Sequence, residues 1–353
     1  MEFQQNPVWV TGAAGWLGRG LIHALLHGVP DDPRLVRSSS TAPIHCLVLP
    51  GDNVADLRPW SPRVQIHEGD VRNAADCAAF LRGAQGAVVF HVAGVIHPRR
   101  AADFAAINTR GTAHVLQGAI EAKARRVVVL SSNSPCGCNP HVDHLFDEES
   151  PYHPYMGYGR SKMQMELLAR ESHASERIET VIVRPPWFYG PHQPPRQTEF
   201  FRMIRDGKMP IVGSGRNRRS MAYIENLAQG LLLAALEPAA AGQTYWIADE
   251  RPYEMNEIVD TVERLLEKEF GQKCAHRRMR LPSLASEVAW TVDFCLQAAG
   301  LYHQKIHVLS EMNKTIACSV EKARREIGYR PRVGLEEGMR RSLRWVMDEG
   351  GGL

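Results

Sequence analysis

Tyr158 and Lys162, which could form an acid–base pair, stand four positions apart in the run Tyr-Gly-Arg-Ser-Lys. Side chains at this spacing share one face of a helix, so the ammonium can lie beside the phenol. A free phenol has a pKa of about 10 and is a poor base at neutral pH, and a nearby cation favours the phenolate. The pair therefore predicts proton transfer by Tyr158, with Lys162 lowering its pKa. The alternative is an exposed Tyr and Lys on a solvated helix.

Two serines could supply a hydroxyl group to the same proton-transfer reaction. Ser131 closes the apolar run of residues 126–131, and Ser132 follows it directly. The carboxyl ends of parallel strands carry ligand-facing groups, so a hydroxyl there can reach the carbonyl oxygen of a substrate. The serines could also simply end a strand and turn the chain.

Glycine spacing near the start of the chain indicates a phosphate-binding turn. Gly12, Gly15 and Gly18 follow the apolar run of residues 8–11 and open a helical pattern. Glycines allow a tight turn and a close approach of the main chain to a diphosphate, which the positive end of the helix then faces. The turn predicts dinucleotide binding, and a purely structural glycine turn is the alternative.

Length and composition limit the classes of protein to which these motifs can belong. The 353 residues suffice for roughly two domains, or for one large α/β unit with an appended lobe. A net charge of +3 does not by itself imply nucleic acid or an anionic membrane as a partner, and no long apolar run predicts a membrane span. Residues 1–7 lack the pattern of a signal peptide, and the seven scattered cysteines are typical of reduced thiols. We expect a globular cytoplasmic protein.

The elements that must position these residues alternate along the first half of the chain. Helical patterns, among them residues 103–124 and 158–172, separate apolar runs expected to be strands at residues 8–11, 44–49, 64–67, 87–92, 126–131 and 180–184. This alternation predicts an α/β fold: a doubly wound parallel (Rossmann) sheet with a smaller C-terminal substrate lobe. Five prolines in residues 185–195 predict an irregular loop there. We assign residues 1–184, together with 211–249, to the dinucleotide-binding domain, and residues 185–210 and 250–353 to the lobe.

The Gly-x2-Gly-x2-Gly spacing, followed by Tyr-x3-Lys, resembles the extended short-chain dehydrogenase/reductase superfamily of sugar-nucleotide epimerases and 3β-hydroxysteroid dehydrogenases. Further matches are Gly69-Asp70-Val71, His91-Val92-Ala93-Gly94, Asn108-x2-Gly111-Thr112 and Arg184-Pro185 with Tyr189-Gly190-Pro191. Counting back five residues from Gly137, as in that superfamily, selects Ser132 over Ser131. The resemblance implies three catalytic residues, Ser132, Tyr158 and Lys162. It also implies a set of cofactor-binding residues: Gly12, Ala14, Gly15, Trp16, Leu17, Asp52, Asp70, Val71, Ala93, Asn108, Tyr158, Lys162 and Pro185.

The resemblance further implies reversible hydride transfer at a secondary alcohol or ketone. The leading substrate class is a nucleotide-activated sugar, with Asn133, Trp187 and Arg219 as substrate contacts and a homodimer as the assembly. Trp187 replaces the Asn that sugar-nucleotide enzymes commonly place there. Asn133-Ser134 after Ser132 replaces their Thr-Asp-Glu run, which disfavours dehydration. Arg219 matches an arginine that binds nucleotide phosphates, although it could equally lie on a solvated arginine-rich loop.

Two other functions remain open. One is a hydroxysteroid-dehydrogenase-like activity on a hydrophobic alcohol, with Trp187 and the apolar residues 281–301 around the substrate, unless that stretch is an ordinary core helix. The other is a non-enzymatic dinucleotide-sensing protein. An acid at the end of the second strand binds the ribose of NAD, and Asp52 is the nearest acid, so NAD is the expected cofactor. Arg72 or Arg37 could instead attract NADP.

A metal site is not expected. Cys136, Cys138, His141 and His144 lie within nine residues, and thiolates with imidazoles can bind zinc. Their spacing is tighter than that of structural zinc sites. The sequence therefore favours a loop with substrate contacts.

Overall fold

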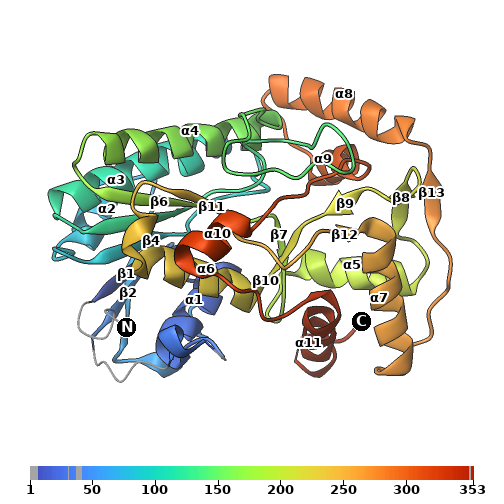
Figure 1. Cartoon of the computed structure of the whole chain (residues 1–353), viewed down its shortest axis with the longest axis horizontal. Coiled ribbons are helices and arrows are strands. Elements are labelled where there is room, and N and C mark those ends of the chain that lie inside the picture. The colour runs from blue at the N-terminus through green and yellow to red at the C-terminus, as the bar shows by residue number, and fades with distance from the viewer. Residues whose placement is uncertain (1–6, 31, 37–41, 350) are drawn as a thin grey trace.

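A computed structural model describes residues 7–30, 32–36, 42–349 and 351–353, and its centre is a parallel sheet of seven strands (Figure 1). The strand order is β11-β6-β5-β4-β1-β2-β3, which confirms the expected doubly wound fold. The strands are β1 Val8–Thr11, β2 Ile44–Val48, β3 Val64–Glu68, β4 Val88–His91, β5 Arg126–Leu130, β6 Glu179–Arg184 and β11 Thr244–Trp246. The order reverses between β1 and β4, and ligands bind at such a switch point.

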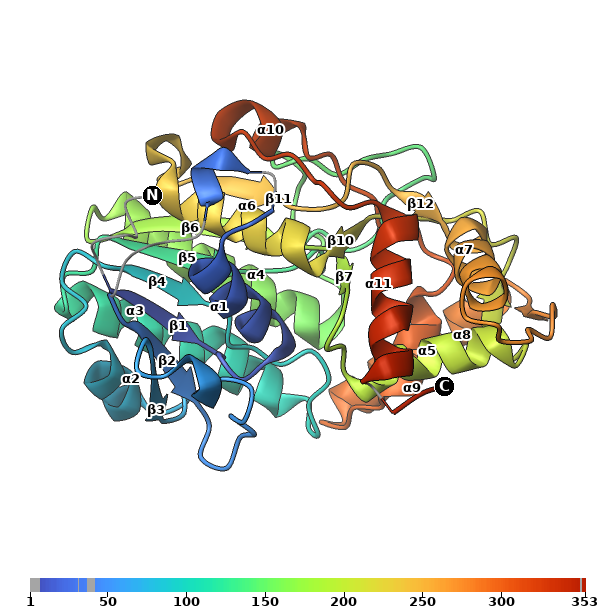
Figure 2. The same cartoon turned by 90° about the horizontal axis from the view of Figure 1, so that it is seen from below.

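Helices cover both faces of this sheet (Figure 2). One face carries α2 Ala74–Leu81, α3 Gly111–Glu121 and α4 Met156–Ala174, and the other carries α1 Trp16–His27 and α6 Ile224–Leu236. Alternate residues of β1 therefore enter two cores: Val8 and Val10 pack on one side, and Trp9 packs on the other. Burial on both faces explains why the strands are apolar without interruption.

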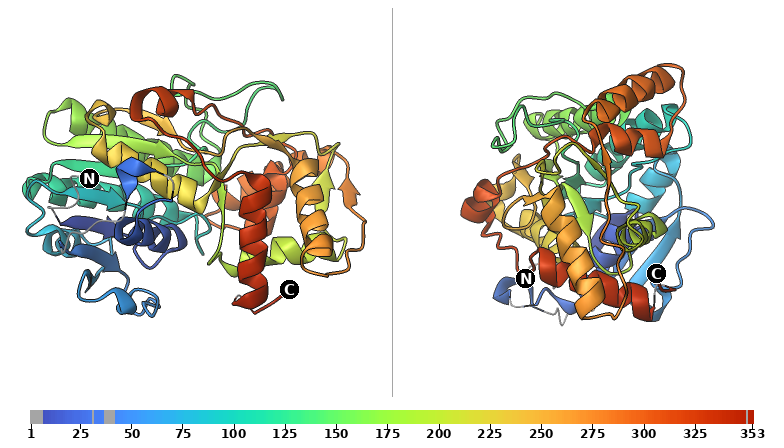
Figure 3. Two further views of the ribbon diagram at one scale, coloured as in Figure 1. Left: turned by 60° about the horizontal axis from the view of Figure 1, so that its bottom comes forward. Right: turned by 90° about the vertical axis from the view of Figure 1, so that its right-hand side faces the viewer.

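The C-terminal part of the chain forms a second layer of helices and three small sheets (Figure 3). The small sheets pair β7 Trp187–Tyr189 with β10 Met221–Tyr223, β9 Arg218–Arg219 with β12 Tyr253–Glu254, and β8 Pro210–Val212 with β13 Met279–Leu281. The helices are α5 Pro195–Arg205, α7 Met255–Lys268, α8 Leu284–Ala298, α9 Gln304–Glu311, α10 Glu321–Ile327 and α11 Leu335–Asp348. Three short 3-10 turns complete the elements, at Pro33–Leu35, Arg58–Trp60 and Pro238–Ala240.

Two expectations about local structure are corrected. The proline-rich residues 185–195 are not simply an irregular loop: they contain β7, and α5 begins at Pro195. Proline is well suited to the first position of a helix because it needs no amide donor there. The single helix expected at residues 103–124 is instead a π-helix, Phe104–Arg110, that runs into α3. Residues 1–6 and Arg37 lie outside the described residues.

Within the parts of the chain that the structure describes, no helix is both long and apolar enough to cross a lipid bilayer.

Candidate active site

The glycine turn between β1 and α1 brings main chain against main chain. Gly12 has a φ of +70°, and a Cβ there would lie 2.7 Å from the Cα of Ala93. A Cβ on Gly18 would lie 2.2 Å from the carbonyl oxygen of Gly12. Only glycine lets this turn pack so closely against the chain that follows β4. The N-terminus of α1 then lies at the carboxyl edge of the sheet. This arrangement fits a dinucleotide diphosphate.

The other residues expected at the turn are held in place by packing. Leu17 is buried, and Ala14 is half-buried beside it. The indole Nε1 of Trp16 donates to the carbonyl oxygen of Pro191, 2.7 Å away. This bond ties the start of α1 to the loop after β7.

A buried histidine joins the carboxyl ends of β1 and β4 to α3. The ring nitrogens of His91 lie 2.8 Å from Thr11 Oγ1 and 2.9 Å from Thr112 Oγ1. Burial lowers the pKa of His91 to about 3, and the charge of Lys162 acts in the same direction. His91 is therefore neutral and acts as a fixed link between these elements.

Asn108, in the π-helix, fixes the chain after β4. Its Nδ2 donates to Val95 O and to Ser161 Oγ, both at 3.0 Å, and its Oδ1 accepts the amide of Val95 at 2.8 Å. A Cβ on Gly94 would lie 3.3 Å from Lys162 Nζ, so this main chain passes directly over the lysine.

Tyr158, Ser132 and Lys162 are brought together at the carboxyl edge of β5. The Tyr158 hydroxyl hydrogen-bonds with Ser132. Ser131, in contrast, donates to Glu166 at 2.5 Å and lies away from Tyr158. Residue type alone does not distinguish the two serines, but their hydrogen-bond partners in the structure do.

The expectation that Lys162 lowers the Tyr158 pKa is not met within the chain itself. Burial raises the pKa of Tyr158 to about 12, against a lowering by the Ser132 hydrogen bond and with a further increase from Glu311. Lys162 Nζ donates instead to the carbonyl oxygen of Leu130 at 2.8 Å. Burial lowers the pKa of Lys162 to about 8, and Glu166 opposes that shift. Desolvation is therefore the largest cause of both shifts.

The two acids expected near the adenosine end of a dinucleotide make local contacts. Asp70 accepts the Nε of Arg72 at 2.7 Å, and chiefly this bond lowers the pKa of its carboxyl group. Asp52 accepts the amide of Leu49 at 3.0 Å just after β2, on the surface. Val71 is buried against Gly111, where a Cβ would lie 2.9 Å from its side chain.

Sequence reasoning missed a buried ion pair behind the catalytic residues. Glu166 receives Nε and Nη2 of Arg184 at 3.0 and 2.7 Å, and it also accepts the hydroxyl of Tyr152 at 2.7 Å. The pair joins α4 to β6, and the hydrogen bond from Ser131 connects both to the end of β5. A signal was available, since Glu166 is four residues after Lys162 on the same helix face.

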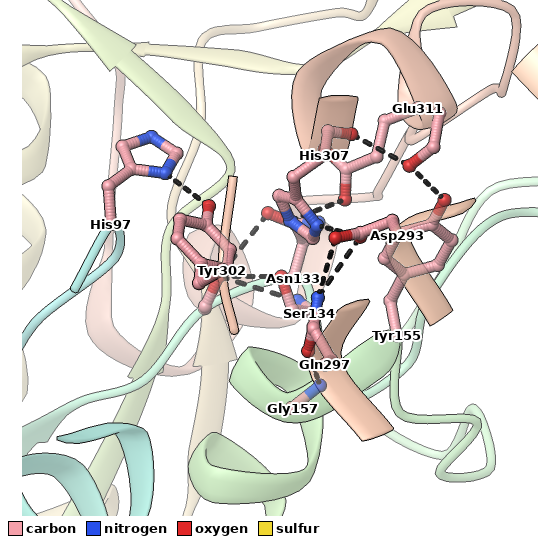
Figure 4. A network of polar contacts seen from close by, with 12 residues as sticks. His97, Asn133, Ser134, Tyr155, Gly157, Asp293, Gln297, Tyr302, His307 and Glu311 are labelled. Carbon is pink, nitrogen blue, oxygen red and sulfur yellow. Dashed lines mark hydrogen bonds and ion pairs between the residues drawn. The ribbon is translucent and has the colours of Figure 1, made fainter. Parts of the chain in front are cut away.

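Sequence reasoning also missed a polar network that α8 and α9 bring to the site (Figure 4). The Nδ1 of His307 lies 2.7 Å from a carboxylate oxygen of Asp293, and Tyr302 bonds to the ring of His97 at 2.6 Å. Burial opposes protonation of His307, but Asp293 and Glu311 outweigh it and raise the pKa. Gln297 accepts the amide of Gly157 at 2.9 Å, one residue before Tyr158. No motif marks Asp293, Gln297, Tyr302 and His307, which lie more than 130 positions from Tyr158 in the sequence.

The three expected substrate contacts differ in their surroundings. Asn133 is half-buried, with Oδ1 3.4 Å from Ser132 Oγ. Trp187 is half-buried with its ring edge-on to Phe200, and Pro185 just before it is buried. Arg219 donates Nη2 to the carbonyl oxygen of Glu311 at 2.5 Å. Its Nε is buried and has no hydrogen-bond partner among the described residues.

Neither interpretation of the apolar residues 281–301 is correct. The stretch forms α8, but Leu284, Val288 and Phe294 are exposed, so they are neither a substrate wall nor a core face. The residues that α8 buries are Ser286, Ala289 and Asp293. The helix packs inward through polar contacts, and this reversed orientation could not be derived from a hydrophobic stretch alone.

The loop with two cysteines and two histidines is held by hydrogen bonds. Cys136 is buried, and burial raises the pKa of its thiol to about 11. His144 Nδ1 lies 2.9 Å from the side-chain Nδ2 of Asn139. Among the described residues, no group of three or more His, Cys, Asp or Glu side chains is arranged to hold a metal ion.

Comparison with known proteins agrees with this fold and site. The family model described as "NAD dependent epimerase/dehydratase family" matches residues 8–248. The chain belongs to this family and is therefore an NAD-dependent enzyme of the extended short-chain dehydrogenase/reductase type. This assignment confirms the expected superfamily and cofactor.

Particular relatives cover nearly the whole chain. The "Uncharacterized protein y4nL" of Sinorhizobium fredii is 53% identical over 344 residues, 97% of this chain and 96% of that protein. The 3beta-hydroxysteroid-dehydrogenase/decarboxylase isoform 1 of Arabidopsis thaliana is 28% identical, over 97% of this chain and 80% of that protein. The crystal structure of DesIV, a dTDP-glucose 4,6-dehydratase from Streptomyces venezuelae with NAD and TYD bound, has 26% identity and a TM-score of 0.75, with 98% of each chain covered.

Proposed function

We propose that this enzyme transfers hydride at a secondary alcohol or ketone of a nucleotide-activated sugar, leading to epimerisation or net reduction. NAD supplies the hydride acceptor and donor. Gly12, Gly15 and the N-terminus of α1 would hold its diphosphate, and Lys162 would bind its ribose. The sugar hydroxyl would lie between Tyr158 and Ser132.

The residues of the chain divide the proton chemistry between them. Tyr158 takes the proton of the substrate hydroxyl during oxidation and returns it during reduction. Ser132 donates to the carbonyl oxygen as it develops. Burial raises the pKa of Tyr158 to about 12, so in the protein alone its phenol is protonated at neutral pH and can donate to a carbonyl oxygen. The positive charge of a bound nicotinamide would lower this pKa and favour proton abstraction.

The observation that favours a nucleotide diphosphate is the state of Arg219. Its guanidinium is half-buried beside Glu311, whose carboxylate raises the Tyr158 pKa and so lies on the side of the catalytic tyrosine. One donor is bound to a main-chain oxygen, whereas the buried Nε has no partner among the described residues. A planar guanidinium suits bidentate recognition of phosphate oxygens.

Binding of uridine diphosphate to the NAD-loaded protein tests this proposal. Arg219→Ala removes a charge-assisted contact, and we expect about 10- to 150-fold weaker binding by calorimetry. Arg216→Ala, three residues away and exposed, is the matched control and should bind like wild type. If wild type binds no nucleoside diphosphate, or if both variants bind equally, the sugar-nucleotide proposal fails.

A second candidate is oxidation or reduction of a hydrophobic alcohol, as in the hydroxysteroid dehydrogenases. It is supported by the half-buried Trp187 against Phe200 and by the Arabidopsis relative, which matches 97% of this chain. Turnover of sterols without any binding of uridine diphosphate would favour this candidate.

Tyr158→Phe tests the catalytic assignment for either substrate. Loss of the phenol hydroxyl should lower turnover by about 10²- to 10⁴-fold and leave NAD affinity close to wild type. Tyr329→Phe is the control, since it also removes a buried hydroxyl, one that bonds to Ala248 O. Retention of more than about a tenth of the activity by Tyr158→Phe would contradict the assignment.

A further inference from the structure

Helix α8 presents its apolar side chains outward. Leu284, Val288 and Phe294 are 69%, 56% and 49% exposed, whereas Asp293 on the opposite side is fully buried. Figures 1 and 3 show α8 along the outer edge of the molecule, beyond the catalytic end of α4. A surface helix normally buries its apolar face, so this reversed arrangement indicates that something else covers it.

The exposed apolar side chains of the molecule concentrate on this helix and its flanks. Of the thirteen large hydrophobic side chains that are exposed among the described residues, eight lie between residues 279 and 308. On α8 these include Trp290, whose ring stacks on Phe294 with centroids 5.6 Å apart. The one charged residue on the outer side of α8 is Glu287, which forms an ion pair with Lys314. The outer face of α8 therefore carries no unpaired charge.

The segment before α8 is basic. Residues 271–286 contain no Asp or Glu, and their exposed cations include Lys273, Arg277 and Arg280. Beyond the helix, residues 299–310 also lack acids and expose one cation, Lys305 on α9. An apolar helix face with exposed cations in the flanking segments is complementary to an anionic lipid surface, where acyl chains lie beneath negative headgroups.

We propose that the outer face of α8 docks this enzyme onto an anionic lipid bilayer, with the helix lying in the interface and the flanking arginines on the headgroups. A second copy of the chain fits less well. In an antiparallel pairing of two α8 helices, Arg280 of one copy would approach Lys305 of the other, and like charges would oppose the contact.

Docking through α8 would place the catalytic chamber close to the membrane. On its inner side α8 holds His307 through Asp293, and Gln297 binds the amide of Gly157 next to Tyr158. The proposal concerns the outer face alone and holds for either substrate class.

Sedimentation of the full chain with vesicles tests the proposal. We expect wild type to bind vesicles of phosphatidylglycerol and phosphatidylcholine and to bind pure phosphatidylcholine much more weakly. Val288→Ser/Trp290→Ser/Phe294→Ser should lower binding by at least about 10-fold. Arg277→Gln/Arg280→Gln should lower binding to anionic vesicles by about 30-fold.

Matched controls distinguish vesicle binding through this face from binding caused by general surface hydrophobicity. Val142→Ser/Leu145→Ser/Leu167→Ser changes three apolar side chains of similar exposure elsewhere on the surface and should bind vesicles like wild type. Unchanged NAD affinity would show that the α8 variant is folded. Equal loss in both triple variants, or absence of wild-type binding to anionic vesicles, overturns the proposal. Self-association that the α8 variant abolishes, without vesicle binding, would assign the face to a second copy instead.

Discussion

Replacing Glu166 by Gln should destabilise the protein strongly, because it leaves the buried Arg184 without its counter-charge. Glu166 is fully buried, and Arg184 opposite it is 1% exposed. The amide can keep one hydrogen bond, but the guanidinium then remains buried without a counter-charge. Removing one partner of such a pair costs about 3–5 kcal/mol. Arg184 also stacks on Tyr152 and Trp246, so it cannot turn to solvent without breaking these contacts.

Thermal unfolding followed by circular dichroism measures this effect. A loss of 3–5 kcal/mol corresponds to a decrease of at least about 5 °C in Tm for a chain of this size. Glu257→Gln is the matched control, because Glu257 forms a two-bond pair with Arg251 on the surface. Exposed pairs contribute about 0–1 kcal/mol, so this variant should stay within about 3 °C of wild type.

Similar Tm values for the two variants would contradict a strong stabilising pair between Glu166 and Arg184. So would a loss of unfolding free energy in Glu166→Gln/Arg184→Gln larger than the sum of the two single losses, since the partners of a real pair lose their interaction only once. A smaller loss in the double variant is the expected outcome.

Two further predictions follow from the turn and from the α8–α9 network. Gly18→Ala forces a Cβ to 2.2 Å from a carbonyl oxygen and should cost about 1–3 kcal/mol and weaken NAD binding in titrations. Gly20→Ala in the same helix should cost less, because its Cβ would meet only the flexible side chain of Ile224, at 3.0 Å, and alanine is the better helix former. Because the folded pKa of His307 is raised, its pairing stabilises the protein fully below about pH 6.5 and is lost as pH rises through the folded pKa. His307→Gln should therefore cost roughly 1.5–3 kcal/mol at pH 6 and progressively less towards pH 9 in unfolding experiments, while His276→Gln, at an exposed pair, should cost less than about 1 kcal/mol. A His307 effect that did not change with pH would contradict this pairing.

Much of the sheet and part of the site follow from local patterns. The strands around residues 8–11, 44–48 and 126–130 could be predicted because both faces of a parallel sheet are buried, and this leaves uninterrupted apolar runs. The glycine turn and the spacing of Tyr158 and Lys162 were equally visible, since a tight turn and one helix face are properties of neighbouring residues.

The electrostatics of the site could not be read from that spacing. Lys162 is on the same helix as Tyr158, but whether it lowers the phenol pKa depends on where Nζ points and how deeply both groups are buried. The fold directs Nζ to Leu130 O and buries the phenol, so desolvation decides the sign. Ser131 and Ser132 show the same limit: residue type alone does not distinguish them, whereas in the structure Ser131 donates to Glu166.

The sequence by itself therefore determined the class of fold and the glycine turn, and it predicted Ser132, Tyr158 and Lys162 as the catalytic residues. The tertiary structure alone decided which side of α8 faces inward, that Glu311 raises the pKa of Tyr158, and which donor of Arg219 is unpaired among the described residues. Periodicity records how apolar a segment is and how its residues repeat. It does not record which neighbour the segment meets. The neighbours of α8 are polar groups: His307 on the next helix, and the Gly157 amide, which lies 140 residues from Gln297 along the chain.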